Sequence, residues 1–139
     1  MMPTYEDIYE FFKDDDDLLL YFDPLSRATN NLEASIEIYD KIVNDHAAKG
    51  GCVFKKTDAW YVFYKKRKWY QRKVLISFCV KPKYRTKDNL VAFGRFIKKE
   101  IGRRFQCYLY SNNTRAIRFL KTIGMNVVKS NNLITLLSI

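Results

Sequence analysis

The sequence contains few of the side chains that bind metal ions. Among its 139 residues there is one histidine, His46, and there are three cysteines, none of them in a C-x-x-C pair. Because metal sites in proteins are clusters of Cys, His and carboxylate ligands, we predict no metal site. Cys52, Cys79 and Cys107 each lie in an apolar or strand-like segment, so we expect buried thiols in a reducing compartment.

Long apolar runs are also absent. No segment approaches the length of a membrane-spanning helix, and the N-terminal stretch MMPTYEDIYEFF is acidic. A secretory signal needs a basic start followed by an apolar segment, so we expect neither a membrane span nor a signal. With 47% hydrophobic residues, the chain is long enough to form a single domain, residues 1–139, around one hydrophobic core.

Acidic side chains are scarce in the later part of the chain. Residues 1–50 contain 12 acidic and 4 basic side chains, whereas residues 51–139 contain 3 acidic and 21 basic ones, giving balances of −8 and +18. A strongly basic half suggests anionic partners, such as nucleic acid, a phosphorylated cofactor or an acidic protein surface. The acidic first third can instead neutralise part of this charge within the fold, and charge alone does not decide.

The hydrophobic pattern changes from helical spacing to strand-like runs at Gly50-Gly51. Helical spacing and cap residues predict helices within 4–13, 14–22, 31–45, 89–102 and 111–124. Aromatic and β-branched runs predict strands at 52–56, 59–64, 69–80, 105–110, 125–129 and 133–139. The expected fold is α+β, with an acidic helical part (1–50), a basic sheet-rich part (51–139) and one mixed, mostly antiparallel sheet flanked by helices.

The segment VKPKYRTKDNLVAFGRFIKKEIG, residues 80–102, passes from a strand through a short basic loop into a helix. A helix that begins in this way presents unpaired backbone N–H groups and attracts anions such as phosphates. Loops that bring their backbone against phosphates usually contain glycine. Between Pro82 and Gly94 there is none.

The second half of the chain, roughly residues 70–139, resembles the GNAT acetyltransferase superfamily. The resemblance consists of V-x-P-x-Y-R after a strand, then N-x-x-A at the start of a second helix, then a glycine at its end and a closing hairpin. The matching residues are Val80, Pro82, Tyr84, Arg85, Asn113, Ala116 and Gly124. The stretch NTRAIRFLKTIG is similar to the GNAT-like virion and assembly proteins of short-tailed bacteriophages, which implies a location in the host cytoplasm or the virion.

This resemblance implies acetyl-CoA as the cofactor. In the superfamily the loop reads R-G-x-G-x-G/A, and its small residues let backbone amides hold the pyrophosphate; here those positions are Thr86, Asp88 and Leu90. Two added side chains and a negative charge disfavour a diphosphate, so we expect weak acetyl-CoA binding or none. The cofactor-binding residues that the resemblance implies are Val80, Arg85, Thr86, Lys87, Asp88, Asn89, Leu90 and Asn113.

Catalytic residues of the superfamily are also missing. The position of its usual tyrosine acid is occupied by Leu120, and the strand VLISFCV lacks the usual glutamate base. The remaining candidates for a proton donor are Tyr84, Tyr108 and Tyr110, although strand aromatics are more often core residues. In active members the strands equivalent to 74–80 and 105–110 part to admit the acyl chain, so an open gap between them favours an enzyme.

Two sets of cations form a predicted basic surface. Aromatic residues surround the first set, a composition found in platforms for single-stranded nucleic acid, although a solvated hairpin with buried rings is the simpler interpretation. The second set falls on and between the two motif helices, where it can contact CoA, DNA or an acidic protein. The residues are Lys65, Lys66, Arg67, Lys68, Arg103, Arg104, Arg115 and Arg118.

The sequence therefore predicts a GNAT-like protein with a decayed acyl-CoA loop. Our leading hypothesis is a non-catalytic virion or accessory protein that contacts phage proteins or nucleic acid through its basic face. An active acetyl-CoA-dependent N-acyltransferase and a nucleic-acid-binding protein are the alternatives. The sequence does not indicate an acceptor, a virion partner or an oligomeric state.

Overall fold

The computed structural model describes residues 3–14, 32–102 and 104–139. Its centre is a six-stranded sheet in the order β1-β2-β3-β4-β6-β5, in which only the β3–β4 pair is parallel. This is the expected α+β architecture with a mixed, mostly antiparallel sheet flanked by helices. The elements are α1 (Tyr5–Phe12), α4 (Leu32–Ala48), β1 (Cys52–Lys56), β2 (Trp60–Lys65), β3 (Lys73–Val80), the 3₁₀ turn η1 (Pro82–Tyr84), α5 (Lys87–Ile101), β4 (Phe105–Tyr110), α6 (Thr114–Thr122), β5 (Asn126–Ser130) and β6 (Ile134–Ser138).

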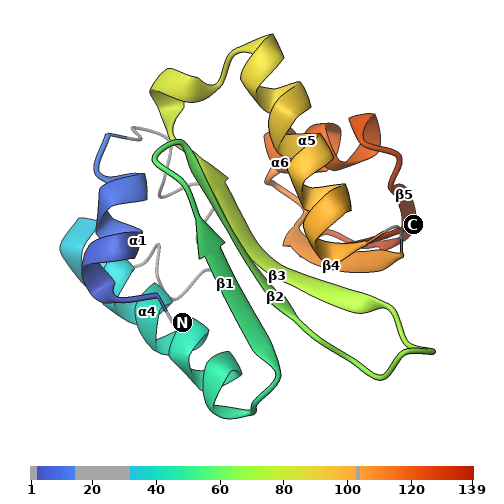
Figure 1. The fold of residues 1–139 in the computed structure, drawn as a ribbon, viewed down its shortest axis with the longest axis horizontal. Coiled ribbons are helices and arrows are strands. Elements are labelled where there is room, and N and C mark those ends of the chain that lie inside the picture. Colours follow the sequence, from blue (N-terminus) through green and yellow to red (C-terminus); the bar gives the residue numbers. More distant parts are fainter. Residues whose placement is uncertain (1–2, 15–31, 103) are drawn as a thin grey trace.

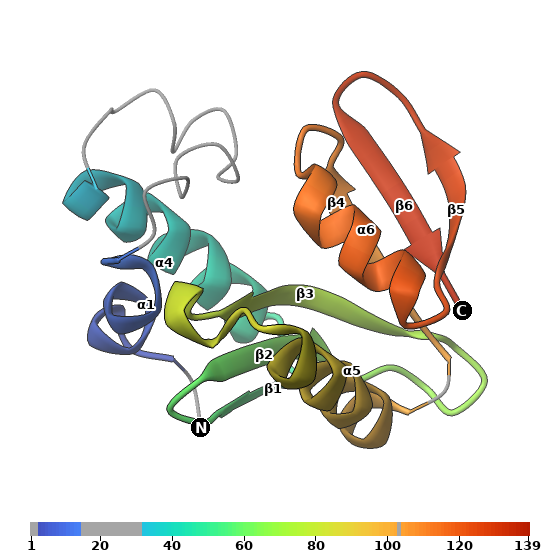
Figure 2. The ribbon, with the colours of Figure 1, turned by 90° about the horizontal axis from the view of Figure 1, so that it is seen from above.

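Helices cover both faces of the sheet. Helices α1 and α4 lie against one face, while α5 and α6 lie against the other (Figures 1 and 2). The α1–α4 side buries Phe11, Ile36 and Phe63 in one hydrophobic cluster. The α5–α6 side buries a larger cluster that includes Phe93 and Leu120. Alternating side chains of β2 feed the two clusters in turn, as the period of a strand requires.

Polar caps determine where three helices begin. The Thr4 hydroxyl accepts from the Asp7 amide while the Asp7 carboxylate accepts from the Thr4 amide, which is a reciprocal capping box. Thr86 and Asn113 accept from the amides of Asn89 and Ala116 at the starts of α5 and α6. Thr4 and Asn113 are therefore the N-caps of α1 and α6. Gly124 has φ of 105° just after α6, a conformation that favours glycine at a helix end.

Several predicted boundaries move. Strand β3 begins at Lys73, so residues 69–72, which we assigned to the strand, belong to a turn instead. Strand β2 ends at Lys65, whose partner is Val74, so residues 66–72 form the connection between the two strands. Helix α4 continues to Ala48, beyond the predicted end at residue 45. The helix predicted within 14–22 lies almost wholly outside the described residues.

The close approach of α5 to α6 explains the glycine inside α5. A Cβ atom added at Gly94 would lie 2.6 Å from Cγ2 of Ile123. That methyl group belongs to a β-branched side chain, which has little rotamer freedom in such a position. Gly94 therefore sets the distance between the two helices and, with it, the width of the cavity described below.

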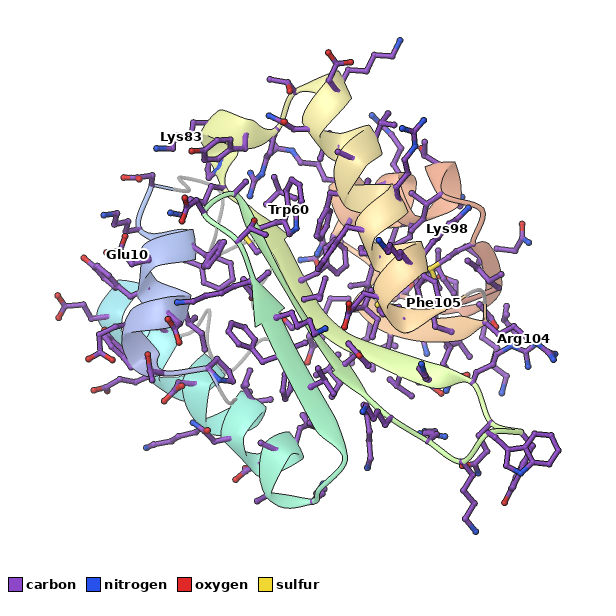
Figure 3. All side chains as sticks on the ribbon, viewed as in Figure 1. Glu10, Trp60, Lys83, Lys98, Arg104 and Phe105 are labelled. Atoms are coloured by element: carbon purple, nitrogen blue, oxygen red, sulfur yellow. The ribbon has the colours of Figure 1, made fainter. Side chains whose placement is uncertain are left out.

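Charge is segregated along the molecule. Glu10 on α1 and Arg104, just before β4, lie on opposite sides of the view in Figure 3. Lys56 pairs with Asp7 across the acidic and basic parts, whereas Lys55 pairs with Glu100 within the basic part at 2.6 Å. None of the described helices has the length and apolar character needed to cross a bilayer.

Candidate functional site

Strands β3 and β4 are paired only near their starts. The parallel ladder joins Lys73 to Phe105, Val74 to Gln106 and Leu75 to Cys107, and then ends. At the next residue β3 has a bulge: Phe63 and Tyr64 of β2 are adjacent, but their partners are Ser77 and Leu75, so Ile76 is the extra residue. A bulge bends its strand and leaves the extra residue out of the ladder. This accounts for the parting of β3 from β4 beyond Leu75.

A cavity of about 1050 Å³ occupies this parting. This volume is slightly above the range of roughly 300–1,000 Å³ typical of ligand sites. Ile76, Ser77 and Cys79 line it from β3, and Tyr108 and Tyr110 line it from β4. The cavity reaches both layers of helices, because α4 contributes lining residues on one side and α5 and α6 on the other. The gap between the strands at 74–80 and 105–110 is therefore open.

The α5–α6 side of the cavity is cationic. Lining residues of α5 recur at spacings of four, four and three, at Lys87, Val91, Arg95 and Lys98, and so lie on one side of the helix. The facing side of α6 adds further basic side chains. The lining cations are Arg85, Lys87, Arg95, Lys98, Arg115 and Arg118. No Asp or Glu is among the described residues that line it. Clustered cations without carboxylates favour a polyanionic ligand in this cavity.

Some of the predicted cofactor-binding residues line this cavity and others do not. Val80, Arg85, Lys87, Leu90 and Asn113 line it. The side chain of Arg85 also braces the loop, because its Nε donates to the Val80 carbonyl at 2.9 Å. The main-chain amide of Arg85 donates to the Pro82 carbonyl within the 3₁₀ turn, so this amide is already used.

Thr86, Asp88 and Asn89 are not among the lining residues. The Thr86 hydroxyl accepts a hydrogen bond from the Asn89 amide at 3.3 Å. This amide is therefore not available to a ligand at the start of α5. The amides of Lys87 and Asp88 have no partner within the helix, as in the first turn of any helix. Asp88 is exposed, and its carboxylate, which we expected to repel a diphosphate, is not part of the cavity lining.

The tyrosines considered as proton donors separate in the structure. Tyr84 is half-buried, packs against the α5–α6 cluster and is not a lining residue. Tyr108 and Tyr110 line the cavity on β4. Leu120 is fully buried in the core, so it offers neither a proton nor an obstruction. Ser77 also lines the cavity, and its hydroxyl lies 3.0 Å from the Tyr61 hydroxyl.

Sequence reasoning missed His46 as a site residue. It lies in the last turn of α4 and lines the cavity together with Ile42 and Val43, on the side opposite the cations. Burial, and then the charges of Lys49 and Lys65, lower the pKa of its imidazole, against a smaller opposing effect of Asp45. A neutral imidazole that lines a cavity can accept a proton from a bound ligand. The helical spacing of Ile42, Val43 and His46 was the only available signal.

Titration of His46 provides a direct check. Because it is the only histidine, its imidazole C–H resonance is unambiguous in an NMR pH titration, and we expect a pKa below the ordinary 6.5. Lys65→Ala should raise this pKa, whereas Lys129→Ala, on the distant strand β5, should not. In the wild-type protein the pKa of His46 is lower in the folded chain than in the unfolded chain, so between these two pKa values the unfolded chain binds more protons. The contribution of His46 to stability is therefore present above pH 6.5 and is lost as pH falls through the folded pKa. A pKa at or above 6.5 would contradict the burial described here.

The residues of the predicted basic surface fall into two groups, those that line the cavity and those that lie elsewhere. Arg115 and Arg118 line the cavity, whereas Lys66, Arg67 and Lys68 are exposed on the β2–β3 connection and Lys65 is partly buried. Arg104 is exposed before β4, and Arg103 lies outside the described residues. Of the aromatic residues near 65–68, Tyr61 and Tyr64 are buried, but Trp69 and Tyr70 are exposed.

Burial raises the thiol pKa of two of the three cysteines, Cys52 and Cys107. All three are thiols rather than disulfides; Cys79 and Cys107 are buried, while Cys52 is only partly so. Burial raises the pKa of Cys107 to about 12, which keeps it protonated near neutral pH. Burial also raises the pKa of Cys52, against a smaller lowering by Lys65.

The fold is that of GNAT acetyltransferases. It is similar to the PaiA N-acetyltransferase of Thermoplasma acidophilum, solved with coenzyme A, at a TM-score of 0.58 and 13% identity over 99% of this chain and 95% of that one. The microcin C7 self-immunity acetyltransferase, solved with acetyl-CoA and AMP, has a TM-score of 0.58 and 10% identity over 100% of this chain and 89% of that one. A GNAT-family acetyltransferase of Bacillus anthracis has a TM-score of 0.51 and 15% identity over 97% of this chain and 87% of that one.

At these identities the similarity is one of fold. No protein-family model matches the sequence. No curated protein matches it either.

Proposed function

We propose that the protein binds acyl-CoA in the cavity between β3 and β4 and transfers the acyl group to an amine. The observation that carries this proposal is the open parting of the strands beyond Leu75, with its cavity of about 1050 Å³. It favours the enzyme over the non-catalytic protein that we placed first from the sequence. The neighbours solved with CoA or acetyl-CoA have the same fold.

The cavity residues fit the chemistry of this cofactor. CoA carries a diphosphate and a further phosphate, and six cations line the side of the cavity formed by the loop, α5 and α6. The amides of Lys87 and Asp88 at the start of α5 add donors and the positive end of the helix dipole. Hydrogen bonds from the arginine guanidinium groups and the charges of the lysines then replace part of the phosphate binding that glycine-rich loops provide through backbone amides alone.

Bound acetyl-CoA supplies an activated acetyl thioester. The chain would position its carbonyl with the main chain of Ile76 and Ser77, which the bulge and the end of the ladder leave beside the cavity. His46 would take the proton from the acceptor amine on the α4 side, and Tyr108 or Tyr110 would donate one to the departing thiolate. Most of the catalytic effect would come from positioning.

The non-catalytic hypothesis retains specific support. Thr86 caps the helix start where a phosphate would otherwise bind, and Leu120 has no proton to donate. In that case the protein is a virion or accessory component of a short-tailed phage, in the host cytoplasm or the particle. Its basic face then contacts another phage protein.

Calorimetric titration separates the two hypotheses. We expect acetyl-CoA to bind one site per chain with micromolar affinity, and 3′-dephospho-CoA to bind more weakly because it lacks one anionic group. Incubation with acetyl-CoA and a panel of amines, followed by mass spectrometry, should then add one acetyl group to an acceptor. Absence of heat at millimolar acetyl-CoA would favour the non-catalytic hypothesis.

A further inference from the structure

The connection between β2 and β3 carries a second concentration of cations, away from the cavity. We call residues 66–72, KRKWYQR, the hairpin tip. Figure 1 shows that it projects beyond the body of the molecule. None of its residues lines the cavity, and its side chains include four cations and no carboxylate.

The hairpin tip also presents two aromatic rings to solvent. Trp69 is 95% exposed and Tyr70 is 61% exposed. Their centroids lie 5.7 Å apart with the ring planes at 88°, and Lys68 Nζ lies 5.9 Å from the Tyr70 centroid. Large aromatic side chains normally bury most of their area, so the fold does not use these rings for its core.

The base of the hairpin tip is anchored. The Lys66 amide donates to the Gly51 carbonyl at 2.7 Å, and the Gln71 amide donates to the Lys68 carbonyl at 2.8 Å, closing a turn. Arg72 Nε donates to the Ile139 carbonyl at 2.8 Å, which draws this cation back toward the sheet. Arg72 is exposed, as are Lys66, Arg67 and Lys68, but this hydrogen bond holds its guanidinium against the C-terminal residue.

We propose that the hairpin tip binds single-stranded nucleic acid. Phosphates would contact Lys66, Arg67 and Lys68, while unpaired bases would stack on Trp69 and Tyr70. Cations alone would suit any polyanion, but exposed rings beside them fit a ligand that has accessible base faces. A duplex hides those faces in its own stack, so the geometry favours single strands. This inference does not depend on the acyltransferase proposal.

Fluorescence anisotropy of a labelled oligo-dT tests the proposal. We expect binding whose logarithmic salt slope is about −0.7 for each phosphate contact, so the double variant Arg67→Ala/Lys68→Ala should lower the slope magnitude by about 1.4. Trp69→Ala should weaken binding at least about fivefold, the lower limit for loss of one stacked base. Trp69→Phe keeps a ring and should retain most of the affinity.

Matched controls locate the site. Lys121→Ala/Lys129→Ala removes two exposed cations elsewhere on the basic part and should leave affinity nearly unchanged. Saturating acetyl-CoA should not displace the oligonucleotide, because the cavity lies apart from the tip. Equal affinity for duplex DNA, full affinity in Trp69→Ala, or binding to anionic vesicles but not to the oligonucleotide would each overturn the proposal.

Discussion

Replacing Ala116 by phenylalanine is expected to reduce acetyl-CoA affinity at least about 100-fold, or roughly 2.8 kcal/mol. Ala116 lies in the first turns of α6, and its small side chain lines the cavity beside the cations of α5 and α6. A phenyl ring there would fill the space that the cofactor must pass through. Calorimetric titration of the variant against wild type measures the loss.

The matched control is Ala92→Phe. Ala92 is exposed on α5 and does not line the cavity, so the same added ring should leave acetyl-CoA affinity within about twofold. Circular dichroism should show native folding in both variants, because neither position is in the buried core. Unchanged affinity in Ala116→Phe would mean that acetyl-CoA binds elsewhere.

Replacing Phe93 by alanine is expected to lower the free energy of unfolding by about 3–5 kcal/mol. Phe93 is fully buried at the centre of an aromatic cluster. Its ring centroid lies 5.4 Å from that of Trp60, 5.6 Å from that of Phe119 and 6.0 Å from that of Phe78. The substitution removes contacts with β2, β3 and α6 together and leaves a cavity between the layers.

Chemical denaturation with urea measures this loss. Because small domains have a total stability of about 5–15 kcal/mol, the variant should be close to unfolding and its Tm should fall by roughly 10–20 °C. Val91→Ala, at an exposed position of the same helix, should change stability by less than about 0.5 kcal/mol. A loss below 1 kcal/mol in Phe93→Ala would show that the cluster does not hold the layers together.

The order of elements and the sheet class could be predicted because local signals agreed. Thr4 and Asn113 are capping residues that act within one turn, so they identify helix starts without tertiary information. Strand β4 matches its predicted bounds, 105–110. The turn residues Trp69 and Tyr70 were misassigned because aromatic residues are typical of strands, while the true connection depends on cross-strand register.

The candidate site was harder to predict for a geometric reason. The bulge at Ile76 lies within the continuous apolar run VLISFCV, which has no local feature to mark it. The direction of Asp88 followed from its helical position: successive residues turn by about 100°, so it lies off the stripe formed by Lys87, Val91 and Arg95. Our expectation that Asp88 disfavours a diphosphate considered its charge and not its position around the helix axis.

The net charges of −8 on residues 1–50 and +18 on residues 51–139, with Glu10 and Arg104 on opposite sides of Figure 3, give the molecule an electric dipole. In the field of a polyanion such a body experiences a torque, so it turns its positive end toward the partner before contact. Its encounter rate should therefore respond to ionic strength more steeply than its net charge of +10 alone would require.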